Sequence, residues 1–342
     1  MRAAIYKGKQ LIQVEEVPTP KPDRNQLLVK VNCSAICGTD VHAFLYDIAP
    51  PGKILGHEFC GTVARVGSNV SKWRTGDRVI GGGGIPPNGM EPATRTHPRF
   101  NYRTMGMLPG MGGSNASAYA EYTIMEEWAP ISIPDRVPDE TAALTEPCAV
   151  AIHAVRQSRL NIGDSVGILG AGPIGLLCIQ VAKAAGAGTV LVSEPALARS
   201  QAAAMLGADA VINPNLDDAT EKMVQLTGGL GPDVIFDCAG IGTTLDQAMN
   251  TVRRGGQVVL VAVPWEPMPL MPVDWMTREV SFQSSWGSLP EDWQVAVQLF
   301  ENSKVSIEPL ISDESFVPLE DIQQTFEALI KPSTQLQMIV RP

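Results

Sequence analysis

Two short segments of this chain bring together residue types that bind transition metals. CGTDVH spans residues 37–42 and GHE spans residues 56–58. Cys37 of the first and His57 of the second offer a thiolate and an imidazole, which are common ligands of zinc. A catalytic zinc site generally uses three protein ligands and leaves one position open. We therefore expect a zinc site that draws a third ligand from elsewhere in the chain.

The segment LTEPCAV offers two candidates for that third ligand, Glu146 and Cys148. Carboxylates and thiolates both occur in catalytic zinc sites, so the residue types alone leave the choice open. Cys148 also has an ordinary explanation, because a lone cysteine is commonly a small buried hydrophobic residue.

A glycine-rich turn in SVGILGAGPIG predicts a dinucleotide site. Gly170, Gly172 and Gly175 have the spacing G-x-G-x-x-G, directly after an apolar run typical of a strand. In that place the first glycine permits a tight turn, the second lets the backbone approach a pyrophosphate, and the third allows close helix packing. The helix that starts near Pro173 and Ile174 would then hold the phosphates at its positive N-terminus.

The same segment has an alternative explanation as a membrane span. Residues 165–182 carry no charge and meet the minimum length for a spanning helix. The glycines and the proline fall where a phosphate-binding turn needs them, however, so we expect no membrane-spanning segment.

The identity of the dinucleotide should depend on the residue that ends the second strand of this unit. Glu194 in TVLVSEP occupies that place. A carboxylate there accepts hydrogen bonds from the ribose hydroxyls and repels a 2′-phosphate, which favours NAD over NADP. A solvated helix-capping role is the alternative for Glu194, and Arg199 keeps NADP open. We also expect Val263, at the end of the apolar run QVVLVAV, to contact the cofactor.

The pattern of the chain changes near residue 150. Before that point, short apolar runs such as LLVKVNC and GTVARVG are broken by Pro and Gly, as in an antiparallel β region. From about residue 161, six apolar strand candidates alternate with helical segments, which indicates a doubly wound parallel sheet. We expect an α/β protein with a catalytic domain over residues 1–150 and 286–342 and a dinucleotide-binding domain over residues 151–285.

In combination these motifs resemble those of zinc-dependent medium-chain alcohol dehydrogenases. The resemblance is carried by CGTDVH, by GHE with glycines at positions 61 and 67, by GDRV, by EP before the coenzyme domain and by GAGPIG, and it covers essentially the whole chain. It implies a GroES-like β-barrel catalytic domain and a Rossmann coenzyme domain. It also implies NAD, one catalytic zinc, a small-molecule alcohol or ketone substrate, and a homo-oligomer, either dimer or tetramer.

The resemblance also implies which residues bind the metal. Cys37 and His57 look like two zinc ligands. Glu58 looks like the neighbouring carboxylate that binds zinc directly in some members and intermittently in others. Glu146 matches the EP ligand of the polyol, butanediol and threonine dehydrogenase-like branch, so we favour it over Cys148.

Three further residues resemble the catalytic machinery around the metal. Asp40 is similar to the carboxylate that orients the ligand histidine, which fixes the tautomer of a metal-bound imidazole. Thr39 and His42 resemble a proton relay that runs from the substrate hydroxyl through Thr39 and the nicotinamide ribose to His42 and solvent. Phe44, Trp265 and Trp286 are candidates for an apolar pocket lining.

These inferences predict a zinc-dependent oxidoreductase that transfers a hydride between a secondary alcohol, diol or polyol and NAD, giving the ketone. One alternative is a zinc-free quinone or enone reductase of the same fold. Another is an NAD-binding protein without turnover.

The composition excludes some partners. The formal net charge of −10 and the sequence pI near 5.0 oppose binding to nucleic acid. The start, MRAAIYKGKQ, has no apolar core of a secretory signal, so we expect a cytoplasmic protein whose six scattered cysteines are thiols or metal ligands.

Many relatives hold a second, structural zinc with four closely spaced cysteines in the loop after GDRV. Residues 81–119 of this chain are rich in Gly, Pro and Met and contain no cysteine. We therefore expect one zinc per chain and no structural zinc.

Overall fold

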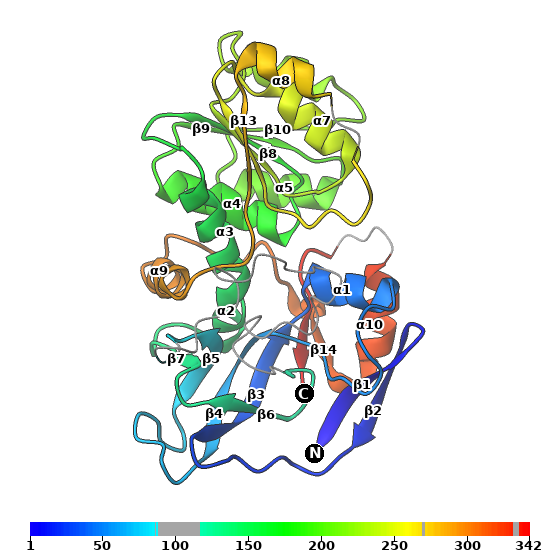
Figure 1. Cartoon of the computed structure of the whole chain (residues 1–342), viewed down its shortest axis with the longest axis vertical. Helices are drawn as coiled ribbons and strands as arrows, with labels where there is room; N and C mark the ends of the chain where they lie inside the picture. Colours follow the sequence, from blue (N-terminus) through cyan, green and yellow to red (C-terminus); the bar gives the residue numbers. More distant parts are fainter. Residues whose placement is uncertain (86, 88–116, 269–270, 331–334) are drawn as a thin grey trace.

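The computed structural model describes residues 1–85, 87, 117–268, 271–330 and 335–342. The chain forms two main sheets joined by helices, one in the upper and one in the lower half of Figure 1. Most of the loop over residues 81–119 lies outside the described residues. The expectation that this loop binds no structural zinc therefore stays a prediction.

The upper sheet has six strands in the order β10-β9-β8-β11-β12-β13, and every neighbouring pair is parallel. This is the strand order of a doubly wound dinucleotide-binding fold. The strands are β8 (Ser165–Leu169), β9 (Thr189–Ser193), β10 (Ala210–Ile212), β11 (Val234–Asp237), β12 (Gln257–Leu260) and β13 (Ser281–Ser284). All six predicted strands are confirmed, although β12 ends three residues before its apolar run does.

Helices cover this sheet and connect its strands. They are α4 (Pro173–Ala184), α5 (Leu197–Met205), α6 (Ala219–Leu226), α7 (Gly242–Thr251) and α8 (Pro272–Arg278). Residues 165–182, for which a membrane span was the alternative explanation, form β8, the glycine turn and most of α4. Within the described part of the chain, no helix combines the length and apolar character that crossing a membrane requires.

The lower sheet is built mainly from antiparallel strands of both chain ends (Figure 1). Its order is β14-β15-β3-β4-β5-β7, with β6 paired to β3, while β1 and β2 form a separate hairpin. The strands are β1 (Arg2–Gly8), β2 (Leu11–Glu16), β3 (Gln26–Ala35), β4 (Glu58–Val66), β5 (Arg78–Gly83), β6 (Tyr122–Glu126), β7 (Pro130–Ser132), β14 (Phe316–Pro318) and β15 (Ile339–Arg341).

The remaining helices lie on the lower sheet or between the two sheets. They are α1 (Gly38–Leu45), α2 (Asp139–Ala143), α3 (Thr145–Gln157), α9 (Pro290–Glu301) and α10 (Ile322–Leu329), with 3-10 turns η2 (Asp313–Ser315) and η3 (Leu319–Asp321). The strands thus divide as the predicted domains do, because the C-terminal strands β14 and β15 join the lower sheet. The boundaries after residues 150 and 285 stay predictions.

Helix α3 ties the two halves together. It packs against α4 of the upper half and against α9, which in turn packs on β5 of the lower sheet. Trp293 of α9 lies over Gly82 and Gly83, where an added Cβ would come within 2.6 Å of its side chain. The carboxylate of Asp292, which is fully buried, contacts Nδ1 of His153 at 2.9 Å and also pairs with Arg156. One continuous core therefore runs from the parallel sheet to the metal-binding half.

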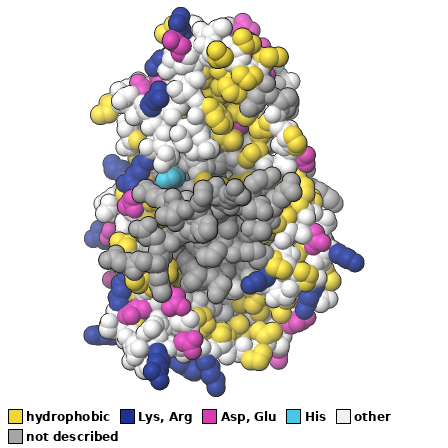
Figure 2. All heavy atoms as spheres, in the orientation of Figure 1, with side chains coloured by type: hydrophobic (Ala, Val, Ile, Leu, Met, Phe, Trp, Pro, Cys, Tyr) yellow, Lys and Arg dark blue, Asp and Glu magenta, His cyan; other side chains and the backbone are white. Residues whose placement is uncertain are grey.

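Exposed apolar side chains gather near the free edge of the parallel sheet. Figure 2 shows hydrophobic side chains collected over the upper part of one face, where Figure 1 places α7 and α8. Met271, Val273 and Met276 around α8 are 61%, 55% and 76% exposed, and Phe282 of the edge strand β13 is 42% exposed. The homo-oligomer stays a prediction.

Candidate active site

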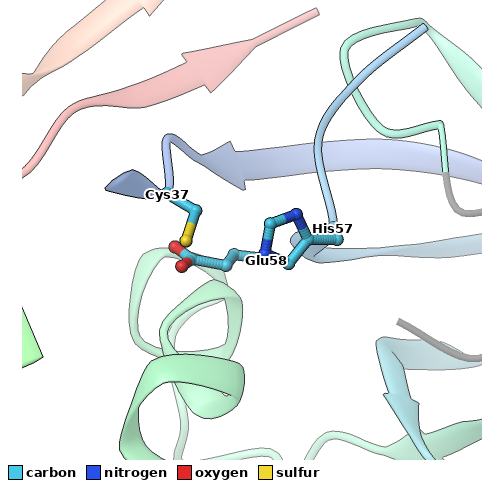
Figure 3. A group of neighbouring side chains, drawn as sticks. All are labelled: Cys37, His57 and Glu58. Carbon is cyan, nitrogen blue, oxygen red and sulfur yellow. The ribbon is translucent and has the colours of Figure 1, made fainter. Parts of the chain in front are cut away.

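Three predicted ligands come together where β3 ends and β4 begins. Cys37 follows β3 and caps the N-terminus of α1, where its Sγ accepts a hydrogen bond from the Thr39 amide at 3.4 Å. The antiparallel register pairs Ala35 with Glu58, so the segment after β3 meets His57 at the start of β4. The ligand atoms of Cys37, His57 and Glu58 all lie within 4.8 Å of one another. Figure 3 shows these three side chains gathered in one place.

His57 and Glu58 are buried, Cys37 is half-buried, and the three groups perturb one another's pKa values. Burial, followed by the nearby Glu58 carboxyl, raises the pKa of the Cys37 thiol to about 12. Burial, followed by the charge of Glu146, raises the pKa of Glu58 to about 8. Burial lowers the pKa of His57, but Asp40 and Cys37 outweigh it and the net shift is upward. Each upward shift favours the protonated form over the deprotonated form that binds a metal, so a bound cation would relieve a cost that the apoprotein carries.

The donor set fits zinc. Glu58 is 3% exposed, and its buried Oε2 has no hydrogen-bond partner among the described residues. A buried carboxylate oxygen without a partner is costly, and coordination to a cation would satisfy it. One sulfur, one imidazole nitrogen and carboxylate oxygen are ligands that zinc accepts in catalytic sites.

The two candidates for the remaining ligand differ in their surroundings. Glu146, in the first turn of α3, is close enough to influence the pKa of Glu58 and is itself influenced by His57 and Asp40. Cys148 lies in the hydrophobic core, and burial with Cys178 nearby raises its pKa. Neither belongs to the closely spaced group of Cys37, His57 and Glu58. Glu146 stays the predicted further ligand.

Asp40 is held between the ligand histidine and a tyrosine. Its Oδ2 lies 3.5 Å from Nδ1 of His57 and accepts a hydrogen bond of 2.7 Å from the Tyr119 hydroxyl. The Tyr119 ring packs against Gly56, where an added Cβ would lie 2.8 Å from ring atoms. Sequence reasoning missed Tyr119 because it follows a segment without periodicity and no motif marks it.

The predicted relay residues lie on α1, beside the ligand cluster. Thr39 is half-buried in the first turn of the helix, and His42 is half-buried one turn later. Burial lowers the pKa of His42, and the Gly38 carbonyl offsets part of that effect. The ring centroids of His42 and Trp265 are 4.9 Å apart.

The apolar lining was predicted less well. Phe44 is fully buried and packs on Tyr6 and Phe326, with centroids 6.3 and 5.4 Å away, so its assignment to a pocket wall is wrong. On α1 the Phe44 side chain faces the core of the lower half, whereas the His42 side chain contacts Trp265 of the upper half. Trp286 is 37% exposed, and its role stays a prediction.

The glycine turn has the geometry that its motif requires. Gly170 has a φ of +89°, a backbone conformation that glycine adopts at little cost. A Cβ at Gly175 would lie 1.9 Å from the Gly170 carbonyl oxygen, so α4 packs closely on the turn. Around Gly172 nothing lies within 4 Å of an added Cβ, which leaves this face open to a ligand. Pro173 and Ile174 follow as the first residues of α4.

Glu194 lies beside this turn and braces it. The residue is buried; its Oε2 accepts a hydrogen bond from the Ala171 amide at 2.7 Å and its Oε1 one from the Ala196 amide at 2.8 Å. The carboxylate therefore has a fixed place at the end of β9, and spare lone pairs remain for ribose hydroxyls. The Nε atom of Arg199 is buried without a hydrogen-bond partner among the described residues. Val263 is half-buried after β12, and its carbonyl oxygen lies 3.5 Å from an added Cβ at Gly240.

Comparison with known proteins decides the family. The alcohol dehydrogenase GroES-like domain matches residues 23–135, and the zinc-binding dehydrogenase domain matches residues 173–302. (R,R)-butanediol dehydrogenase of Bacillus subtilis (strain 168) is 32% identical over 100% of both chains. The chain belongs to the zinc-binding alcohol dehydrogenase family. Its GroES-like and Rossmann domains confirm the predicted fold class.

Two further proteins of this family are similar to the chain over most of its length. Sorbitol dehydrogenase of Bacillus subtilis is 35% identical over 77% of this chain and 75% of its own. A zinc-binding dehydrogenase from Sinorhizobium meliloti, solved with NADP bound, has a TM-score of 0.86 at 30% identity, covering 100% of this chain and 99% of that chain. The protein is thus a zinc-binding dehydrogenase that uses a nicotinamide dinucleotide.

The contact between Tyr119 and Asp40 yields a testable prediction. Tyr119→Phe removes the hydroxyl that holds Asp40 but keeps the ring against Gly56. We expect zinc affinity to fall roughly 10-fold or more, because residues that orient a metal ligand typically contribute that much. Competition with a chelator of known affinity measures it, with Tyr122→Phe on β6 as the matched control. If Tyr119→Phe binds zinc as tightly as the control, Asp40 holds His57 without help from Tyr119.

Proposed function

We propose that this dehydrogenase oxidises a secondary alcohol, diol or polyol to the ketone and passes the hydride to NAD. The observation that carries the proposal is the closely spaced group of Cys37, His57 and Glu58 directly beside α1, which bears Thr39 and His42. Support also comes from the relatives, which act on butanediol and sorbitol. Both are small molecules with neighbouring hydroxyl groups.

The metal would be held by Cys37, His57 and Glu146, with Glu58 as a further carboxylate in reach. When bound, zinc supplies a Lewis acid that stabilises negative charge on a substrate oxygen. Asp40 keeps Nδ1 of His57 occupied, so that Nε2 is the nitrogen free to bind the metal. Because the group is buried, its charges act on one another through little water, and their interactions are stronger than at a surface.

The proton follows a separate route over α1. Thr39 offers a hydroxyl that can accept a proton and donate its own, and His42 offers an imidazole that is neutral near physiological pH. The lowered pKa of His42 keeps this imidazole neutral at more acidic pH than an exposed one. We infer that Thr39 receives the substrate proton and that His42 passes it towards solvent.

We infer NAD as the preferred dinucleotide because of Glu194. Two backbone amides fix its carboxylate at the end of β9 next to the glycine turn. A negative charge held there repels a 2′-phosphate and can accept hydrogen bonds from ribose hydroxyls. Arg199 is the residue that would oppose this preference, as a cation in the first turn of α5.

The two alternative functions lack the support that this one has. A zinc-free reductase would have no need for a thiol, an imidazole and a carboxylate within ligand distance of one another. A binding protein without turnover would have no need for the half-buried Thr39 and His42 on the adjoining helix.

The test of the proposal is a panel of secondary alcohols, diols, polyols and their ketones, assayed with zinc-loaded protein and each dinucleotide. We expect reduced nicotinamide to form with at least one alcohol of the panel. Cys37→Ser should lose zinc and turnover but keep NAD binding, since the glycine turn lies in the other domain. NAD binding without turnover across the whole panel would favour the non-catalytic alternative.

For the cofactor, we expect kcat/KM with NAD to exceed that with NADP by about tenfold or more, or about 1.4 kcal/mol. Glu194→Gln removes the charge at nearly constant shape and should narrow the ratio, mainly by improving NADP. Arg199→Gln is the matched control and should leave NAD preferred. An unchanged ratio in Glu194→Gln would mean that this carboxylate does not face the ribose.

For the relay, His42→Gln should slow alcohol oxidation by about 100-fold below pH 7, since general base catalysis typically contributes at least that much. Zinc content and NAD binding should stay unchanged. Added imidazole or higher pH should restore part of the rate, because an external base then takes the proton. Full activity and an unchanged pH profile would show that His42 is a packing residue.

A further inference from the structure

Trp265 reaches from the coenzyme domain onto the helix that carries the relay histidine. It lies on the segment after β12, yet its ring centroid is 4.9 Å from that of His42 and 5.5 Å from that of Tyr46. The rings of His42 and Tyr46 lie 6.0 Å apart with their planes 14° from parallel. The three rings thus form one cluster, in which residues of α1 contact a residue of the other domain.

The contact covers His42 without supplying a charge. The groups that influence the pKa of His42 are its burial, which lowers it, and the Gly38 carbonyl, which raises it. The charged residues of the neighbouring segments turn elsewhere: Asp40 towards Tyr119, and Asp47, just after α1, towards the Tyr6 hydroxyl. Glu266, next to Trp265, is exposed. Tyr46, the remaining titratable neighbour, presents its ring face.

No hydrogen bond of the indole explains why Trp265 lies against His42 in the described part of the chain. Its indole Nε1 is buried and has no hydrogen-bond partner among the described residues. A buried indole N–H without a partner carries a cost, so the ring contacts with His42 and Tyr46 are what this placement gains.

We propose that Trp265 is a positioning residue for His42, covering its imidazole from the coenzyme domain and fixing the ring for proton transfer. The proposal rests on the relay function proposed above. Covering one face of the imidazole removes water from it, which favours the neutral ring. His42 then remains a proton acceptor at pH values where an exposed histidine would already be protonated.

The direct test is the intrinsic fluorescence of zinc-loaded protein as a function of pH, without substrate. Protonation of the imidazole places a positive charge next to the indole ring, and this change alters the emission of the ring. We expect a titration step with a midpoint below about 6.5, the ordinary value for histidine. The step should be absent in Trp265→Phe and in His42→Gln. It should persist in Trp275→Phe, a matched control whose ring stacks on Phe282 at 6.4 Å.

The second test is the pH profile of alcohol oxidation. Trp265→Ala uncovers His42, so its pKa should rise and the acidic limb of kcat/KM should move up by roughly half a unit or more. Trp265→Phe keeps an aromatic cover and should move the limb less, and Trp275→Ala should not move it. Imidazole proton NMR of each variant gives the pKa of His42 independently of turnover.

The outcomes separate the two proposals. A fluorescence step that survives in Trp265→Phe, or an unchanged His42 pKa in Trp265→Ala, overturns the covering role whatever the activity. A His42 pKa that rises while the activity profile stays fixed shows that His42 does not relay the proton, and it overturns the positioning role together with the relay. Parallel shifts of pKa and activity support both.

Discussion

The active site depends on four ionisable side chains held together in one place, two of them buried and two half-buried. Cys37, His57, Glu58 and Glu146 lie close enough to influence one another, and burial raises the pKa values of the thiol and both carboxyls. Without a cation the group must stay protonated or hold unpaired negative charge away from water, and both are costly. A divalent metal removes that conflict, which is why the surrounding structure is best understood as a holder for zinc.

The backbone explains how such a group can be kept in place. The register of β3 and β4 brings the segment after one strand against the start of the next, so Cys37 and His57 meet without a long loop between them. Glu146 comes from α3, the same helix that packs against α4 and α9. The helix that carries the proposed ligand Glu146 thus also links the two halves of the chain, and Trp265 of the upper half contacts α1 of the lower half.

Much of the fold and of the candidate site could be predicted from the sequence, because these features depend on local sequence patterns. The strands of the parallel sheet, the glycine turn and the closely spaced ligands follow from periodicity and motif, and Gly170 and Gly175 have the predicted roles. Contacts between distant segments could not be predicted. The hydrogen bond from Tyr119 to Asp40 and the ring contact between Trp265 and His42 each join residues more than 70 positions apart. The prediction that Phe44 lines a pocket was wrong for the same reason, since its core partner Phe326 lies near the other end of the chain.

The central claim is that the thiolate of Cys37, with nitrogen and oxygen ligands, holds the catalytic zinc. X-ray absorption at the zinc edge of the purified protein tests it most directly, because sulfur ligands lie at about 2.3 Å and nitrogen or oxygen ligands at about 2.0 to 2.2 Å. The account predicts a single sulfur from Cys37, with the remaining ligands nitrogen and oxygen. Two or more sulfur ligands would contradict it, because Cys148 would then have to leave the core in which it is fully buried.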